Sequence, residues 1–212
     1  MSEAKQANAG GKGGWLFFLI GFVVLLALGW YVFPMILYSK KVQPVSFSHK
    51  LHIEGTGMEC TECHAFRADG TFMGVPNMTS ESDGACLVCH DDPESTQGED
   101  PREKEFLAEY VATGKERIDW LIYSKQPPCV FFPHSVHVIM KEIECSRCHG
   151  EMAERDEPPV YQQNYITGYS RDIWGRRISG HKKYPWDAMK MGDCGDCHEE
   201  QGGSNACFVC HK

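Results

Sequence analysis

Five copies of one short motif, Cys-x-x-Cys-His, occur between residues 60 and 211 of this 212-residue chain. The copies are Cys60-Cys63-His64, Cys86-Cys89-His90, Cys145-Cys148-His149, Cys194-Cys197-His198 and Cys207-Cys210-His211. Two thiols at this spacing can bond to the two vinyl groups of one porphyrin, and the adjacent histidine then faces the iron as an axial ligand. The motifs therefore predict five covalently bound haem c groups.

Two other chemistries use the same cysteine spacing. A Cys-x-x-Cys pair can bind zinc or form a redox-active disulfide. One motif alone would leave these interpretations open, whereas five copies, each with a histidine directly after the second cysteine, favour haem. Because haem c is attached outside the cytoplasm, we expect the motif-bearing part of the chain on the periplasmic side of the inner membrane.

Five of the ten histidines lie outside the motifs, which equals the number of predicted irons. These candidates for the second, distal axial position are His49, His52, His134, His137 and His181. If each iron takes one of them, every haem is six-coordinate and relays electrons instead of binding a substrate. The arithmetic favours an electron-transfer protein that is not an enzyme by itself. Methionine is the alternative distal ligand, and the chain contains nine.

Cys129 is the one cysteine that belongs to no motif. A lone cysteine is most often an inert thiol. The alternative is a sixth haem c held through a single thioether, which would leave one iron without a full pair of histidines.

Residues 38–64 recur at residues 123–149 with a constant offset of 85, and 11 of the 27 aligned positions are identical. The repeat aligns Phe47, His49, His52, Cys60 and His64 with Phe132, His134, His137, Cys145 and His149. Such ungapped identity indicates a duplicated structural unit.

The repeated unit, Phe-x-His-x-x-His followed by a haem motif, resembles the class III, or c3-like, multihaem cytochromes. The resemblance implies that the first histidine of each pair ligates the haem of its own motif. His49 would then pair with His64, and His134 with His149. The second histidine reaches a neighbouring haem in that family, which leaves His52, His137 and His181 for the other three irons in an undetermined order.

Residues 15–38 contain no charged side chain. A helix of this length reaches about 36 Å, which is enough to cross a hydrocarbon core of about 30 Å. The alternative is a cleaved signal peptide, but its apolar region is usually only about 7–15 residues long. The run therefore predicts a single transmembrane anchor.

These features predict a fold that is mostly irregular and short-helical, with a core built from haem and one N-terminal transmembrane helix. A helix is expected from the capping residue Asp100 to about Thr113, with Glu103 returning to cap its first turn. The expected organisation is a cytoplasmic tail (1–14), the anchor (15–38), a module with two haems (39–99), a helical spacer (100–122) and a module with three haems (123–212).

The net charge of −8 argues against nucleic-acid binding, which requires a basic surface. After residue 41 there are 28 acidic and 17 basic residues. Such a surface can steer a basic redox partner. The simpler interpretation is a solvated acidic face.

The anchor, the duplicated unit, the five motifs and the segment 168–198 together resemble the multihaem cytochrome c subunits of membrane menaquinone reductase complexes (Qrc type) and of alternative complex III. The resemblance implies an iron–sulfur subunit, a molybdopterin-oxidoreductase-like subunit and a polytopic quinone-binding subunit as partners. It also implies exchange of electrons with a soluble periplasmic cytochrome c, which is c3-like in the menaquinone reductase complexes.

The menaquinone reductase type implies electron flow towards menaquinone, whereas alternative complex III implies flow outward from quinol. A quinol dehydrogenase of the NapC/NrfH type is a further alternative. That type carries four haems, and in its NrfH form the first motif continues as Cys-x-x-Cys-His-x-Met, whereas Phe66 stands at the methionine position here.

Overall fold

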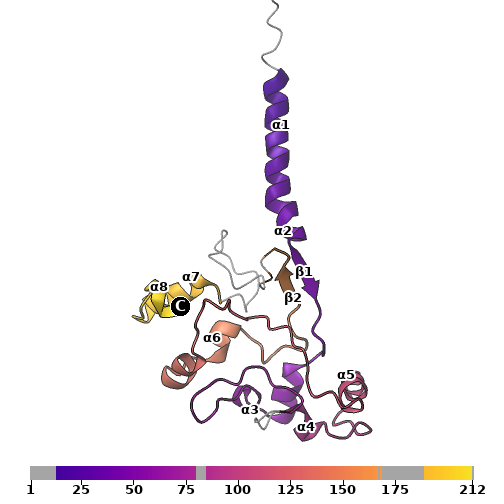
Figure 1. Cartoon of the computed structure of the whole chain (residues 1–212). Coiled ribbons are helices and arrows are strands. Elements are labelled where there is room, and N and C mark those ends of the chain that lie inside the picture. Colours follow the sequence, from indigo (N-terminus) through magenta and orange to yellow (C-terminus); the bar gives the residue numbers. More distant parts are fainter. Residues whose placement is uncertain (1–12, 80–84, 167, 169–188, 212) are drawn as a thin grey trace, which may run out of the picture.

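The structure is a computed structural model that describes residues 13–79, 85–166, 168 and 189–211 (Figure 1). The α-helices are α1 (Gly13–Ala27), α2 (Phe33–Ile36), α3 (Cys60–Cys63), α4 (Cys86–Cys89), α5 (Pro101–Phe106), α6 (Cys145–His149), α7 (Met191–Glu200) and α8 (Cys207–Cys210). Four π-helical turns are η1 (Leu28–Val32), η2 (Leu51–Gly55), η3 (Leu107–Val111) and η4 (Ser135–Met140). Irregular backbone joins these short elements, which confirms the predicted mostly irregular, short-helical character.

The N-terminal helix projects away from the rest of the described residues (Figure 1). It continues through α1, η1 and α2, and its segment Gly14–Val32 is long and apolar enough to cross a membrane, with none of it buried against the body. The helix ends at Ile36, before the end of the uncharged run, because Tyr38 already begins a strand.

A two-stranded antiparallel sheet ties the base of this helix to the second half of the chain. Strand β1 (Tyr38–Lys41) pairs with β2 (Tyr161–Asn164), so that Tyr38 lies opposite Asn164. The backbone N–H of Tyr165 extends the ladder by donating to the carbonyl of Leu37. The sheet therefore connects the helix directly to residues far along the sequence.

A small side-chain core lies beside α4 and η3. Its buried members are Met78, Tyr110 and Ile118, with exposed fractions of 0%, 5% and 2%. The side chain of Asn77 closes this core, since its Oδ1 accepts the backbone N–H groups of Met78 at 3.0 Å and Ile118 at 2.6 Å. Partly buried neighbours complete it: Val45, Cys86, Leu87, Phe106, Val111 and Trp120.

The helix predicted from Asp100 is present as α5 followed by η3. Asp100 caps it by accepting the N–H of Arg102 at 2.9 Å, and the chain turns away at Gly114 with a φ of 67°. The predicted capping role of Glu103 is wrong. Its carboxylate instead accepts the N–H groups of Gln97 at 2.7 Å and Gly98 at 3.0 Å, because the preceding turn folds back over the start of the helix.

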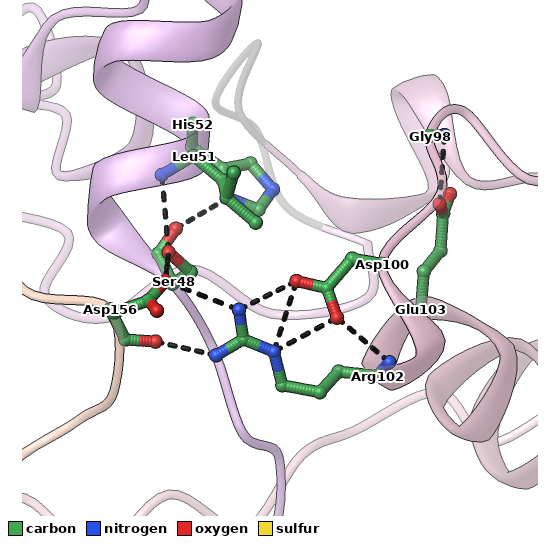
Figure 2. Close-up of polar contacts among 8 residues, drawn as sticks. All are labelled: Ser48, Leu51, His52, Gly98, Asp100, Arg102, Glu103 and Asp156. Carbon is green, nitrogen blue, oxygen red and sulfur yellow. Dashed lines mark hydrogen bonds and ion pairs between the residues drawn. The ribbon is translucent and has the colours of Figure 1, made fainter.

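Arg102 joins three segments of the body, as Figure 2 shows. Its guanidinium contacts the carboxylate of Asp100 at 2.6 Å and that of Asp156 at 3.2 Å. Asp156 also accepts the hydroxyl of buried Ser48 at 2.9 Å. These hydrogen bonds from Ser48 and Arg102 lower the pKa of Asp156, and those from Arg102 lower the pKa of Asp100.

Candidate haem-binding sites

Each Cys-x-x-Cys-His motif lies on one helical turn: α3, α4, α6, the middle of α7, or α8. In three of them the histidine N–H donates to the carbonyl of the first cysteine, at 2.8 Å for His64 and 2.9 Å for His90 and His211. Residues three apart share a helix face, so both thiols of a motif lie on the same side of the turn. No disulfide joins any two of the eleven cysteines, all of which lie in the described residues. No group of three or more metal-ligating side chains converges within the described residues.

The duplication predicted from the sequence is also a duplication of geometry. The Phe47 ring lies 4.9 Å from that of His49 and 4.3 Å from that of His52, and the matching distances from Phe132 are 4.8 Å to His134 and 4.4 Å to His137. In both copies the second histidine also bonds through Nδ1 to the carbonyl four residues earlier, Ser48 or Pro133. The two units therefore present their histidines in the same way.

The second histidine of each unit faces the histidine of a later motif. The ring centroids are 6.3 Å apart for His52 and His90, and 6.1 Å apart for His137 and His198. Two imidazoles on opposite sides of one iron have centroids about 6 Å apart, since each metal–nitrogen bond is about 2 Å. Both pairs thus fit one iron between them.

The first histidines are buried near the motifs of their own units. Burial lowers the pKa of His49 to about 4, with a further contribution from nearby His64, and lowers the pKa of His149 to about 4, with a further contribution from nearby His134. The Nδ1 atom of His49 is buried without a hydrogen-bond partner among the described residues. A neutral imidazole is the form that binds a metal.

The pKa shifts of several thiols show which motifs lie near one another. Burial raises the pKa of Cys145 with a contribution from the Cys60 thiol, so the first and third motifs are neighbours. Burial raises the pKa of Cys86 to about 11 with a contribution from Cys63, which lies in the first motif. Burial likewise raises the pKa of Cys194 to about 11, with contributions from the thiols of Cys148 and Cys210.

The Nδ1 atoms of three motif histidines have different partners. His64 and His198 each bond to a backbone carbonyl at 2.9 Å, that of Gly74 and of Ser204. A carbonyl only accepts, so Nδ1 carries the proton and Nε2 is free to ligate iron. His90 instead has its Nδ1 2.9 Å from Oε1 of Glu103, although the ring is not turned for a well-directed hydrogen bond.

Two predicted residues remain without a partner assignment. His181 lies outside the described residues, as does most of the segment 168–198 that contributed to the resemblance. Cys129 is exposed and lies beside the fifth motif, where Val130 bridges to His211 and the N–H of Phe131 donates to the carbonyl of Cys210 at 2.7 Å.

The sequence analysis missed Phe72 and misassigned Glu103. The Phe72 ring stacks 4.1 Å from His134 and lies 6.4 Å from His64, so it stands between the first motif and the histidine pair of the second unit. Phe72 belongs to no recognisable motif and has no counterpart in the repeat, so the spacing of residues could not predict its role. The position of Glu103, three residues after Asp100, is typical of a capping glutamate, and the sequence therefore did not reveal its contact with His90.

Comparison with protein families matches residues 45–105 and 130–212 to cytochrome c7 and related cytochrome c. All five motifs fall inside the two matched segments. Among characterised proteins, the menaquinone reductase multihaem cytochrome c subunit of Nitratidesulfovibrio vulgaris (strain Hildenborough) is 41% identical over 215 residues, which cover 94% of this chain and 91% of the relative. These findings confirm the resemblance stated from the sequence.

Proposed function

This chain belongs to the family of cytochrome c7 and related cytochromes c, and on that premise we propose that it is the electron-relay subunit of a membrane complex that reduces menaquinone. It carries five haem c groups on its five motifs. Bound haem supplies one-electron ferric/ferrous chemistry. The chain's own residues attach the groups, ligate the irons and set the distances between them, and the chain is not catalytic alone.

The facing pairs His52–His90 and His137–His198 are the observation that carries this proposal. We assign both members of each pair to one iron, and we assign His49 to the iron of His64 and His134 to that of His149. His181 then remains for the iron of His211. Every iron receives two histidines, which favours transfer of electrons over binding of a substrate. Cys129 is a spare thiol in this assignment.

The mutual effects of the thiols on their pKa values support a single-file order of the motifs. The second motif neighbours the first through Cys86 and Cys63, and the first neighbours the third through Cys60 and Cys145. The third neighbours the fourth through Cys148 and Cys194, and Cys194 neighbours Cys210 of the fifth. The order is therefore second, first, third, fourth, fifth, with the two duplicated units meeting at Phe72. Figure 1 shows α4, α3, α6 and then α7 with α8 in the same succession.

The remaining parts of the proposal concern the membrane and the partners. The segment Gly14–Val32 spans the inner membrane once, and the motifs lie on the periplasmic side with the haem-filled core. An iron–sulfur subunit, a molybdopterin-oxidoreductase-like subunit and a polytopic quinone-binding subunit complete the complex. A soluble periplasmic cytochrome c donates the electrons.

The ligand assignment is tested by removing one distal histidine at a time. His52→Ala and His137→Ala should each convert one of five low-spin irons to high-spin, as seen by electron paramagnetic resonance, while the intact mass still reports five haems. The high-spin signal of His52→Ala should vanish when Cys86→Ala and Cys89→Ala are added. Its survival in that background would disprove the pairing of His52 with His90.

The function is tested on the complex purified from membranes in detergent. We expect the three partner subunits to copurify and reduced periplasmic cytochrome c to drive menaquinone reduction. A homodimer without partners would disprove the complex. Electron flow only from quinol to the cytochrome would instead support a subunit of the alternative complex III type.

A further inference from the structure

The histidine of the second motif has a charged neighbour where two other motif histidines have neutral ones. His64 and His198 bond to backbone carbonyls, whereas Nδ1 of His90 lies 2.9 Å from a carboxylate oxygen of Glu103. The Glu103 side chain is 10% exposed and that of His90 is 19% exposed, so little water separates or screens them. This buried Nδ1 has no well-directed hydrogen bond among the described residues, so its contact with Glu103 is electrostatic.

The surroundings hold the Glu103 carboxylate at this position. Oε1 accepts the N–H of Gln97 and Oε2 accepts that of Gly98, so the carboxylate is fixed by the turn that precedes α5; Figure 2 shows the bond to Gly98. Arg102, the adjacent residue, forms its ion pairs with Asp100 and Asp156 and none with Glu103 among the described residues. The negative charge of Glu103 is therefore directed towards His90.

Carboxylate contact changes a ligating imidazole in a defined direction. A carboxylate charge beside the second ring nitrogen polarises the imidazole and makes it a stronger donor to the metal. The negative charge also opposes the loss of positive charge when a ferric iron takes up one electron and becomes ferrous. Both effects favour the ferric state, and hydrogen bonding and charge around the ligands are known controls of haem potential.

We propose that Glu103 is a positioning residue that holds His90 and lowers the reduction potential of the iron at the second motif. This inference rests on the proposed function, because it requires haem at Cys86 and Cys89. In the proposed single-file order this motif is an end of the relay, and Figure 1 places α4 on the side of the body opposite α1. A terminal iron with a lowered potential passes electrons on towards the first, third, fourth and fifth motifs in turn.

The test compares Glu103→Gln with the full-length protein in a redox titration followed by optical and electron paramagnetic resonance spectra. Glutamine keeps an oxygen for the backbone N–H groups but removes the charge, so the chain should still fold. We expect the midpoint potential of one iron to rise and the other four to stay unchanged. Glu103→Asp keeps the charge one methylene further away and should give an intermediate potential.

Glu105→Gln is the matched control. Glu105 is exposed on the same helix, and this substitution removes the same charge at a position away from His90. It should leave all five potentials unchanged. In a His52→Ala background the iron at this motif carries the high-spin signal, and the rise caused by Glu103→Gln should follow that signal. Unchanged potentials in Glu103→Gln, or the same shift in Glu105→Gln, would overturn the inference while the haem count by mass still upheld the proposed function.

Discussion

The segment around α4, α5 and η3 and the segment containing α7 and α8 both carry haem motifs, but they are held together differently. The first has buried apolar side chains, with Met78 fully buried and Ile118 2% exposed. In the second, Phe208 is 90% exposed and Met191 63% exposed, and Asn205, in the loop between the two helices, donates a hydrogen bond to the carbonyl of Gly195 in α7.

This difference indicates how the chain distributes its stabilisation. Burial of apolar area contributes about 25 cal/mol per Å². The second motif has protein side chains to provide such burial, whereas residues 189–211 need another apolar surface, which porphyrin provides in our proposal. Folding of the C-terminal segment should therefore depend more strongly on haem attachment.

Withholding haem should have the largest effect and should separate the two segments. In a full-length chain produced without haem attachment, we expect amide hydrogen exchange in residues 189–211 to lose all protection, because little else buries those amides. Residues 106–120 should retain part of their protection. Mass spectrometry of peptides from the haem-loaded and haem-free chains measures both, and equal loss in the two segments would contradict the comparison.

Met78→Ala should destabilise the haem-loaded protein by about 2–5 kcal/mol, since it opens a cavity in a fully buried core. Met191→Ala removes the same side chain from an exposed position on α7 and should cost about 0.5 kcal/mol or less. Denaturant titrations of the two variants provide the measurement. An equal cost at Met191 would show that this side chain is buried in the haem-loaded protein and would contradict the comparison.

Asn77→Ala should cost about 1–3 kcal/mol, because it leaves the backbone N–H groups of Met78 and Ile118 without their acceptor. Asn205→Ala is the matched control in the other segment. Asn205 donates one exposed hydrogen bond, and its loss should cost about 0.5–1 kcal/mol. Thermal unfolding of both variants tests the difference, which should be absent if the two asparagines play equal roles.

Arg102→Lys and Arg147→Lys should have the smallest effects and still differ. Arg102 contacts two carboxylates with its planar guanidinium group, and its side chain is 25% exposed. Arg102→Lys should therefore lower the free energy of unfolding by about 1 kcal/mol. Arg147 forms one ion pair with Glu200, both about 60% exposed, and should change stability by about 0.3 kcal/mol or less. Urea titrations at low and high salt check this order, and a reversed order would count against Arg102 as a link between segments.

Local patterns predicted the repeated parts of the structure well. The spacing of Phe47, His49 and His52 was enough to expect the matching geometry around Phe132, because a short helical turn fixes which side chains share a face. The capping residue Asp100 and the glycine at 114 likewise marked the limits of one helix. Glu103 was misassigned because a capping pattern does not show that the preceding turn folds back to compete for its carboxylate.

The sequence by itself determined the number of haem motifs, the duplication, the apolar N-terminal helix and the family, since each follows from residue types at short, fixed spacings. The tertiary structure decided that His52 faces His90 and His137 faces His198, which motifs are neighbours, and that Glu103 lies beside His90. These relations span long stretches of irregular backbone, which has no periodicity to read from the sequence. Their geometry depends on packing and hydrogen bonds between distant segments, such as the contacts of Asp156 with Ser48 and Arg102.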